Sequence, residues 1–215
     1  MSKNFKGYLG DQIGKLGTAV GRRWKRKMVY ASYQGKVRNP RTAAQLLARA
    51  KFKLMTSLCS AFDAALALGL RQMANSRQCT ERNCFTSLNY GVLEGSTPEG
   101  VTVDPSLLKI SQGSLTGVIF NPTVDVTTPG KVTVTIDNGN SGAPKTSADD
   151  RVYVQLFNPE QMNGVLSEAV ARTARTVEVP VPSQWEGQEA HAYGFVVNAA
   201  GKASETIYIG HATIG

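Results

Sequence analysis

The hydrophobic periodicity of the chain changes once, near residues 94–100, and this change constrains the fold more than any other feature. Between residues 47 and 73, apolar side chains recur mainly every four residues, which is the spacing of one helix face. After residue 100, apolar and polar residues alternate in short runs, as in strands with one buried face. Residues 94–100, Glu-Gly-Ser-Thr-Pro-Glu-Gly, have the composition of a linker. The sequence therefore predicts an α+β chain, with a basic module at 1–93 and an all-β domain at 101–215.

A long amphipathic helix dominates the predicted first domain. Two starts are available: Asn39 followed by Pro40, and the capping box from Thr42 to Gln45. From either start the pattern predicts a helix of about thirty residues, which is long for a globular protein and can bend or end at Gly69. The face expected to be buried carries Leu47, Leu54, Leu58, Phe62, Leu66, Leu70 and Met73.

Shorter elements are predicted before and after this helix in the sequence. A second helix is expected over residues 80–89, with Phe85 and Leu88 facing inward. The stretch before the long helix is rich in glycine, which disfavours helix and favours short strands and turns. Two strands are expected there, Thr18–Trp24 and Met28–Tyr33.

The second domain shows about seven short strands separated by turn signals, which predicts an immunoglobulin-like sandwich. Trp185 is expected to fill the core near one corner of this sandwich. The clearest strands are 131–137, 151–157, 176–181 and 206–209, and the weaker ones are 107–111, 123–126 and 191–198.

Charge is divided unevenly between the two halves. Residues 1–93 hold 17 Lys and Arg against three acidic residues, whereas residues 94–215 hold 7 against 13. A basic surface of this kind favours an acidic partner, either nucleic acid or protein. The same uneven charge permits self-association into a larger assembly, in which the basic half of one copy contacts the acidic half of another.

The densest basic segment, residues 22–27, surrounds a tryptophan. Bases that contact phosphates, with an aromatic ring for stacking, are typical of nucleic-acid binding. The alternative is a solvated basic turn with Trp24 folded under the sheet. The residues expected to contact an acidic partner are Arg22, Arg23, Trp24, Lys25, Arg26, Lys27, Arg38, Arg41, Arg49 and Lys53.

No catalytic, cofactor or metal site is expected. The glycine series lacks the phosphate-loop pattern. His191 and His211 have no Cys or carboxylate at metal-ligand spacing in the sequence, and Cys79 and Cys84 lack a second pair for zinc. Asp149 and Asp150 are better explained by a turn before a strand. The prediction is a non-enzymatic protein, with a small hydrolase as a remote alternative.

The sequence also predicts where the protein is located. Its longest apolar run is too short to span a membrane, and the start of the chain lacks the apolar region of a secretory signal. The odd cysteine count favours reduced thiols in Cys59, Cys79 and Cys84. We therefore expect synthesis in the cytoplasm, with the virion as a candidate destination and no membrane span.

Three motifs of the chain are distinctive: the spaced glycines of residues 7–21, Asn39-Pro40-Arg41-Thr42-x-x-Gln45, and Ala148-Asp149-Asp150-x-Val152-Tyr153-Val154. The resemblance that they carry is to a family of uncharacterised Bacteroidota proteins. It implies an immunoglobulin-like C-terminal domain and no established activity. Residues 35–52 are also similar to small proteins of tailed-phage structural regions. That likeness implies a structural protein of a phage particle or phage-derived assembly, with a cellular nucleic-acid-binding protein as the alternative.

Overall fold

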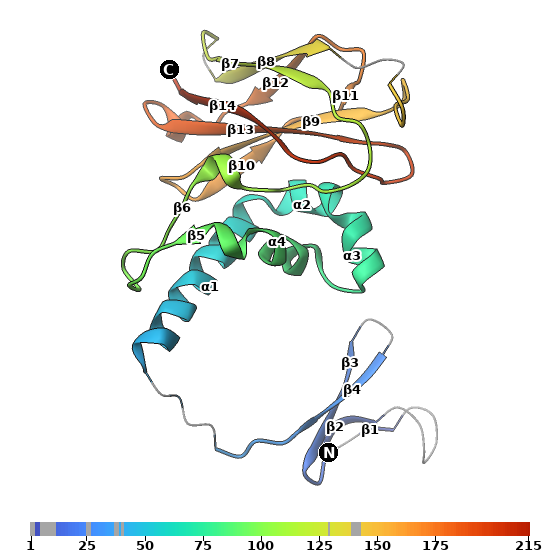
Figure 1. The fold of residues 1–215 in the computed structure, drawn as a ribbon, viewed down its shortest axis with the longest axis vertical. Coiled ribbons are helices and arrows are strands. Elements are labelled where there is room, and N and C mark those ends of the chain that lie inside the picture. The colour runs from blue at the N-terminus through green and yellow to red at the C-terminus, as the bar shows by residue number, and fades with distance from the viewer. Residues whose placement is uncertain are drawn as a thin grey trace. The chain divides into compact units, whose positions relative to one another are not determined.

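The computed structural model describes residues 3–4, 12–24, 27–36, 39, 41–128, 130–138 and 143–215, and Figure 1 shows their arrangement. The chain divides into two compact units, Met1–Thr42 and Ala43–Gly215. The strands of unit 1 are β1 (Lys3–Asn4), β2 (Gln12–Leu16), β3 (Ala19–Trp24) and β4 (Lys27–Ser32). The helices of unit 2 are α1 (Ala43–Ala61), α2 (Asp63–Gly69), α3 (Arg71–Arg77) and α4 (Glu81–Asn89). Its strands are β5 (Leu93–Glu94), β6 (Thr102–Val103), β7 (Ile119–Asp125), β8 (Lys131–Asn138), β9 (Arg151–Asn158), β10 (Asn163–Leu166), β11 (Val170–Ala171), β12 (Thr176–Pro180), β13 (Glu189–Val197) and β14 (Ile207–Thr213).

Unit 1 is an antiparallel sheet in the order β1-β2-β3-β4. The two strands expected before the long helix are confirmed as β3 and β4, whereas Lys25 and Arg26, expected in the turn between them, lie outside the described residues. Gly21 is required where the strands meet, because a Cβ atom there would overlap the Gln12 carbonyl oxygen and lie 3.0 Å from the Tyr30 ring.

The long helix of the sequence prediction is wrong in its length and is divided into three. Helix α1 begins at Ala43, directly after Thr42, which fits the second of the two expected starts. The axes of α1 and α2 differ by 79°, with Phe62 at the break. The ring of Phe62 lies 4.8 Å from that of Phe157 and 5.5 Å from that of Tyr193. The bend therefore keeps the apolar stripe in contact with the sheet, and α2 ends at Gly69, as that glycine suggested.

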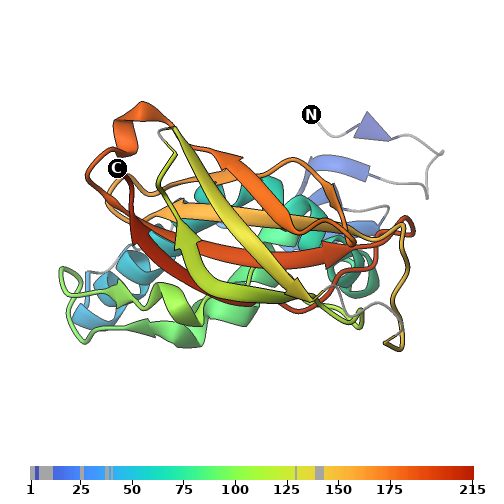
Figure 2. The same cartoon turned by 90° about the horizontal axis from the view of Figure 1, so that it is seen from above.

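Besides the helices and the short β5–β6 hairpin, unit 2 contains two larger antiparallel sheets. One has the order β10-β9-β13-β14 with β11 paired to β9, and the other has the order β12-β8-β7. Alternate residues of both sheets meet in one apolar core, which also encloses the fully buried Trp185. Figure 2 shows the strands of the two sheets crossing above the helices, so unit 2 has three layers.

The predicted strand at 107–111 is wrong, because Pro105 opens a 3-10 turn that includes Leu107. The following residues instead pass between α4 and β14. There the Oγ1 atom of Thr206 accepts hydrogen bonds from the backbone nitrogens of Ile110 (2.8 Å) and Ser111 (2.7 Å).

The division of the chain differs from the predicted boundary at 94–100. Strands β5 and β6 pair across that segment, so it is the loop of a short hairpin. Residues on both sides of it share one core, in which Phe62 and Phe85 from the helices join Phe157 and Tyr193 from the sheet. The first break between compact units instead follows Thr42. The helices thus belong with the sheets, and only the N-terminal strands form a separate unit.

Within the described part of the chain, no single helix is long and apolar enough to cross a membrane. Helices α1 and α2 meet the length and composition test only when taken together, across their bend.

Leu58 provides a direct test of the helix–sheet core, because its side chain is fully buried. We expect Leu58→Ala to lower the free energy of unfolding of unit 2 by about 2–5 kcal/mol, since it leaves a cavity in that core. Leu107→Ala is the control, because Leu107 is 54% exposed and its truncation should change stability by less than about 0.5 kcal/mol. Equal effects of the two variants in urea titrations would contradict the helix–sheet packing.

Candidate functional site

The register of unit 1 places basic and aromatic side chains on one face of its sheet. Trp24 pairs with Lys27, Arg22 with Val29, and Val20 with Lys15. Paired residues of antiparallel strands project to the same side, as do alternate residues along a strand. Lys15, Arg22, Trp24 and Lys27 therefore share one face, which we call the basic face.

Side chains of the basic face are open to solvent. Lys15, Arg22 and Lys27 are exposed, and Trp24 is 49% exposed. The Nζ atom of Lys15 lies 3.7 Å from the centre of the Tyr33 ring, in a cation–π contact. The indole of Trp24 is therefore not folded under the sheet, as the alternative interpretation required, and it shares its face with three cations.

The other predicted contact residues are distributed differently. Arg23 is exposed but projects from the opposite side of the sheet, beside Met28. Arg41 is exposed just before α1, while Arg49 and Lys53 are exposed one turn apart on α1 in unit 2. Lys25, Arg26 and Arg38 lie outside the described residues. The structure thus brings together Arg22, Trp24 and Lys27 of the predicted set and adds Lys15.

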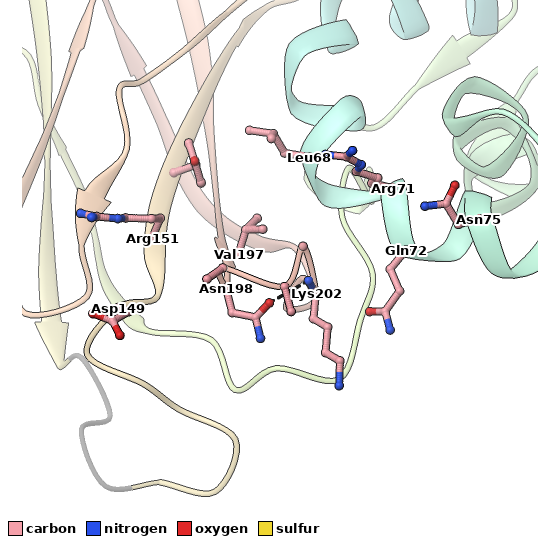
Figure 3. A pocket seen from close by; sticks show the side chains of 13 residues that line it. Leu68, Arg71, Gln72, Asn75, Asp149, Arg151, Val197, Asn198 and Lys202 are labelled. Carbon is pink, nitrogen blue, oxygen red and sulfur yellow. Dashed lines mark hydrogen bonds between the residues drawn. The ribbon is translucent and has the colours of Figure 1, made fainter.

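A broad polar groove of about 880 Å³ lies in unit 2, between the helices and one end of the sheet that contains β9 and β13. Figure 3 shows Arg71, Gln72 and Asn75 on the helix side, and Arg151 and Lys202 on the strand side. The other lining residues are Leu68, Asp149, Tyr153, Val197, Asn198, Ala199, Ala200 and Gly201.

This groove offers charge and hydrogen bonding rather than an evident catalytic set. Its residues include three cations and one carboxylate, Asp149, and none of the described lining residues is Ser, Cys or His. A nucleophile paired with a general base, as acyl transfer requires, is therefore not found among them.

A second polar cluster lies at the other end of strands β13 and β14. His191 of β13 pairs directly with His211 of β14, and Glu189 is two residues before His191 on the same face. The Nε2 atoms of both histidines lie 3.6 Å from Oε1 of Glu189. The Oη atom of Tyr208 lies 2.9 Å from Nδ1 of His191 and 3.5 Å from Nδ1 of His211. Burial lowers the pKa of His191.

The expectation that no carboxylate accompanies the histidines is wrong. Twenty residues separate His191 and His211 in the sequence, so linear spacing does not join them. The signal that was missed is Glu189-x-His191 in an alternating strand, followed by a strand that returns beside it.

The cysteines show one close contact. Sγ of Cys79 lies 3.0 Å from Sγ of Cys84, in the first turn of α4. Burial, together with the neighbouring Cys79, raises the pKa of Cys84 to about 12. The Cys84 thiol is therefore protonated at neutral pH and is a poor nucleophile.

Asp150 has a structural role. Its side chain and that of Arg172 are each 2% exposed, and Nη1 of Arg172 lies 3.1 Å from Oδ2 of Asp150. Asp149 is exposed, so the two neighbouring carboxylates do not form one site.

Comparison with known proteins gives a family but no activity. No curated protein matches the chain. A family described as being of unknown function, DUF6266, matches residues 10–210, which include most of unit 1 and nearly all of unit 2. This agrees with the expectation of an uncharacterised family. The chain therefore belongs to DUF6266.

Proposed function

We propose that this protein is a non-enzymatic structural component of a phage particle or phage-derived assembly, and that its basic face docks on nucleic acid. The observation that carries the proposal is the half-exposed Trp24 on the same face as Lys15, Arg22 and Lys27. An acidic protein surface is the other partner that this charge favours. A cellular nucleic-acid-binding protein is the second candidate function.

The chemistry of the basic face suits a single-stranded nucleic acid. Lysine and arginine neutralise phosphates and release counterions, which supplies affinity without sequence preference. An exposed indole stacks on an unpaired base, which is worth about 1–3 kcal/mol per base. An acidic protein surface offers carboxylates to the cations but no base for Trp24, so the tryptophan favours nucleic acid.

We infer further that the two sheets of unit 2 form an immunoglobulin-like sandwich that makes protein–protein contacts. Counting only the strands of the two facing sheets and leaving out β11, the first, second and fifth strands (β7, β8, β12) form one sheet. The third, fourth, sixth and seventh (β9, β10, β13, β14) form the other. In this interpretation β7, β8 and β12 correspond to strands A, B and E of an immunoglobulin-like domain and β9, β13 and β14 to strands C, F and G, while β10 is added beside C and no D strand is assigned. The likeness of residues 35–52 to small proteins of tailed-phage structural regions supports the role in an assembly.

The fluorescence of Trp24 can report on binding, because the chain has two tryptophans and the other, Trp185, is fully buried. We expect a single-stranded oligonucleotide to quench the fluorescence of Trp24 saturably and to leave that of Trp185 unchanged. Trp24→Ala should weaken binding by about 5–150-fold, which is the loss of one stacked base.

Trp24→Phe is the matched control, since it keeps an aromatic ring but removes the indole emission. Quenching should disappear in this variant while most of the affinity, followed by anisotropy of a labelled oligonucleotide, remains. Full-strength binding by Trp24→Ala would contradict the role of the indole. Binding of polyglutamate in place of the oligonucleotide would identify the acidic-protein partner instead.

A further inference from the structure

We propose that Glu189, His191 and His211 form a binding site for a divalent transition-metal ion of the Zn²⁺ class. This inference goes beyond the proposed function and does not depend on it, because the three residues lie in unit 2, away from the basic face in the sequence. It rests on the convergence of three ligand atoms from two paired strands.

The backbone fixes two of these ligands opposite each other. His191 and His211 are direct partners in the β13–β14 ladder, and their ring centres lie 5.6 Å apart. Glu189 reaches both rings from the same face of β13, with its Oε1 atom 3.6 Å from each Nε2. A ligand atom from each of the three residues lies within 4.8 Å of those of the other two.

These separations are close to those of an occupied site. Zinc bonds of about 2.0–2.1 Å in a tetrahedron place neighbouring ligand atoms about 3.3 Å apart. The two Nε2–Oε1 distances of 3.6 Å are already close to this value, and side-chain rotation brings the three ligand atoms, which lie within 4.8 Å of one another, to coordinating distance of one ion. His211 and Glu189 have exposed side chains, at 61% and 47%, and are free to make this adjustment.

Tyr208 orients the rings for this role. Its Oη atom lies on the Nδ1 side of both histidines, 2.9 Å from His191 and 3.5 Å from His211. Histidines that bind metals commonly donate the N–H of the second ring nitrogen to such a partner, which leaves the first nitrogen unprotonated for the ion. In that state the Nε2 lone pairs of both histidines face the Glu189 carboxylate. These three electron-rich groups repel one another, and a cation bound between them removes the repulsion.

The donor set selects the kind of ion. Two imidazoles and one carboxylate suit Zn²⁺, Ni²⁺ or Cu²⁺, whereas Mg²⁺ and Ca²⁺ prefer oxygen ligands alone. Three protein ligands leave at least one coordination position for water or for an outside group. The exposure of His211 and Glu189 makes that position accessible.

The experiment is a calorimetric titration of the full chain with Zn²⁺, after removal of metal by EDTA and in the presence of a non-thiol reductant. Its background is Cys79→Ala/Cys84→Ala, because these two sulfurs are the competing soft ligands. We expect one Zn²⁺ per chain, both in this background and in the unaltered protein.

Variants of the three ligands give the decisive comparison. His211→Ala changes an exposed residue and leaves the fold intact, and should weaken Zn²⁺ binding by more than about 100-fold, which is the upper end of the loss for an outer-shell partner. Glu189→Gln should show a loss of the same order, and Tyr208→Phe a loss of about 10-fold. The control is Glu168→Gln, an exposed carboxylate between β10 and β11, and it should bind like the parent.

Two results would overturn the site. One is unchanged Zn²⁺ affinity in His211→Ala, which would show that the ion binds elsewhere. The other is the absence of saturable binding at micromolar Zn²⁺ in the unaltered protein, which would reduce the cluster to a hydrogen-bonded network around Tyr208. Melting curves for each variant show whether the fold is retained.

Discussion

Asp150→Ala is expected to lower the free energy of unfolding of unit 2 by about 3–5 kcal/mol, since it breaks a buried ion pair and leaves the charge of Arg172 without that carboxylate. Arg172 would keep its hydrogen bonds from Nη2 to the carbonyl oxygens of Thr116 and Gly117, each 2.8 Å. It would lose the carboxylate of Asp150, whose Oδ2 is 3.1 Å from Nη1. The backbone nitrogen of Ser147 would also lose its acceptor, Oδ2 of Asp150 at 2.9 Å.

This network ties three parts of unit 2 together: the start of β9, the end of β11 and the segment before β7. Its removal should therefore loosen one end of both sheets rather than a single strand. Asp150→Asn, which keeps the shape and one oxygen acceptor, should cost less than Asp150→Ala.

The surface pair of Lys131 and Glu178 is the matched control. Nζ of Lys131 lies 2.8 Å from Oε2 of Glu178, a shorter distance than in the buried pair, but the side chains are 53% and 60% exposed. Glu178→Ala should cost less than about 1 kcal/mol, because water solvates the remaining charge. Similar losses for Asp150→Ala and Glu178→Ala in urea titrations would show that burial does not decide the strength of these pairs.

Strands with one buried face were predictable from the sequence. Residues 131–137 alternate because Val132, Val134 and Ile136 point into the core while the residues between them do not, and that alternation is a local property. The edge strand β10 was missed, because Asn163-Gly164-Val165-Leu166 shows no full alternation. Its place is set by pairing with β9 and not by its own pattern.

The bend at Phe62 could not be predicted from the hydrophobic periodicity. Leucines four residues apart keep the same spacing whether the helix is straight or bent, and Phe62 itself continues the stripe. What bends the chain is the tertiary contact of Phe62 with Phe157 and Tyr193, more than ninety residues away. The end of α2 at Gly69 was suggested by the residue type. The glycine itself is required by a close approach of Ser111, since a Cβ atom at position 69 would lie 2.5 Å from Cβ of Ser111.

The two candidate sites also differ in how far the sequence alone could predict them. The basic face lies within a local hairpin, so a cluster of bases around Trp24 was visible in the sequence. The addition of Lys15 required the register of β2 against β3. The Glu189, His191 and His211 cluster depends on a pairing across β13 and β14, which only the sheet topology supplies.

Reversal of charge on the basic face is the second large effect. We expect Arg22→Glu/Lys27→Glu to weaken the binding of single-stranded DNA by more than about 100-fold at low salt, because two attractions become repulsions of like charge. Both side chains are exposed and belong to unit 1. The unfolding of unit 2 should therefore be unchanged.

The control for this variant is Lys109→Glu/Arg175→Glu, which makes the same change in net charge at two exposed positions of unit 2. It should bind DNA within a few-fold of the parent at moderate salt, since neither residue belongs to the basic face and salt screens their remaining effect. Equal losses in the two double variants would mean that net charge, and not the basic face, controls binding.

The most direct test of the basic face is the salt dependence of DNA binding by the full chain, compared with that of Arg22→Glu/Lys27→Glu. Phosphate contacts by Lys15, Arg22 and Lys27 predict a slope of log affinity against log salt of about −2, at about −0.7 per contact with single strands. The double variant keeps only Lys15 of the three contacts, so its slope should be no steeper than about −0.7. A flat slope in the parent, or the same slope in both proteins, would contradict the assignment of nucleic-acid binding to this face.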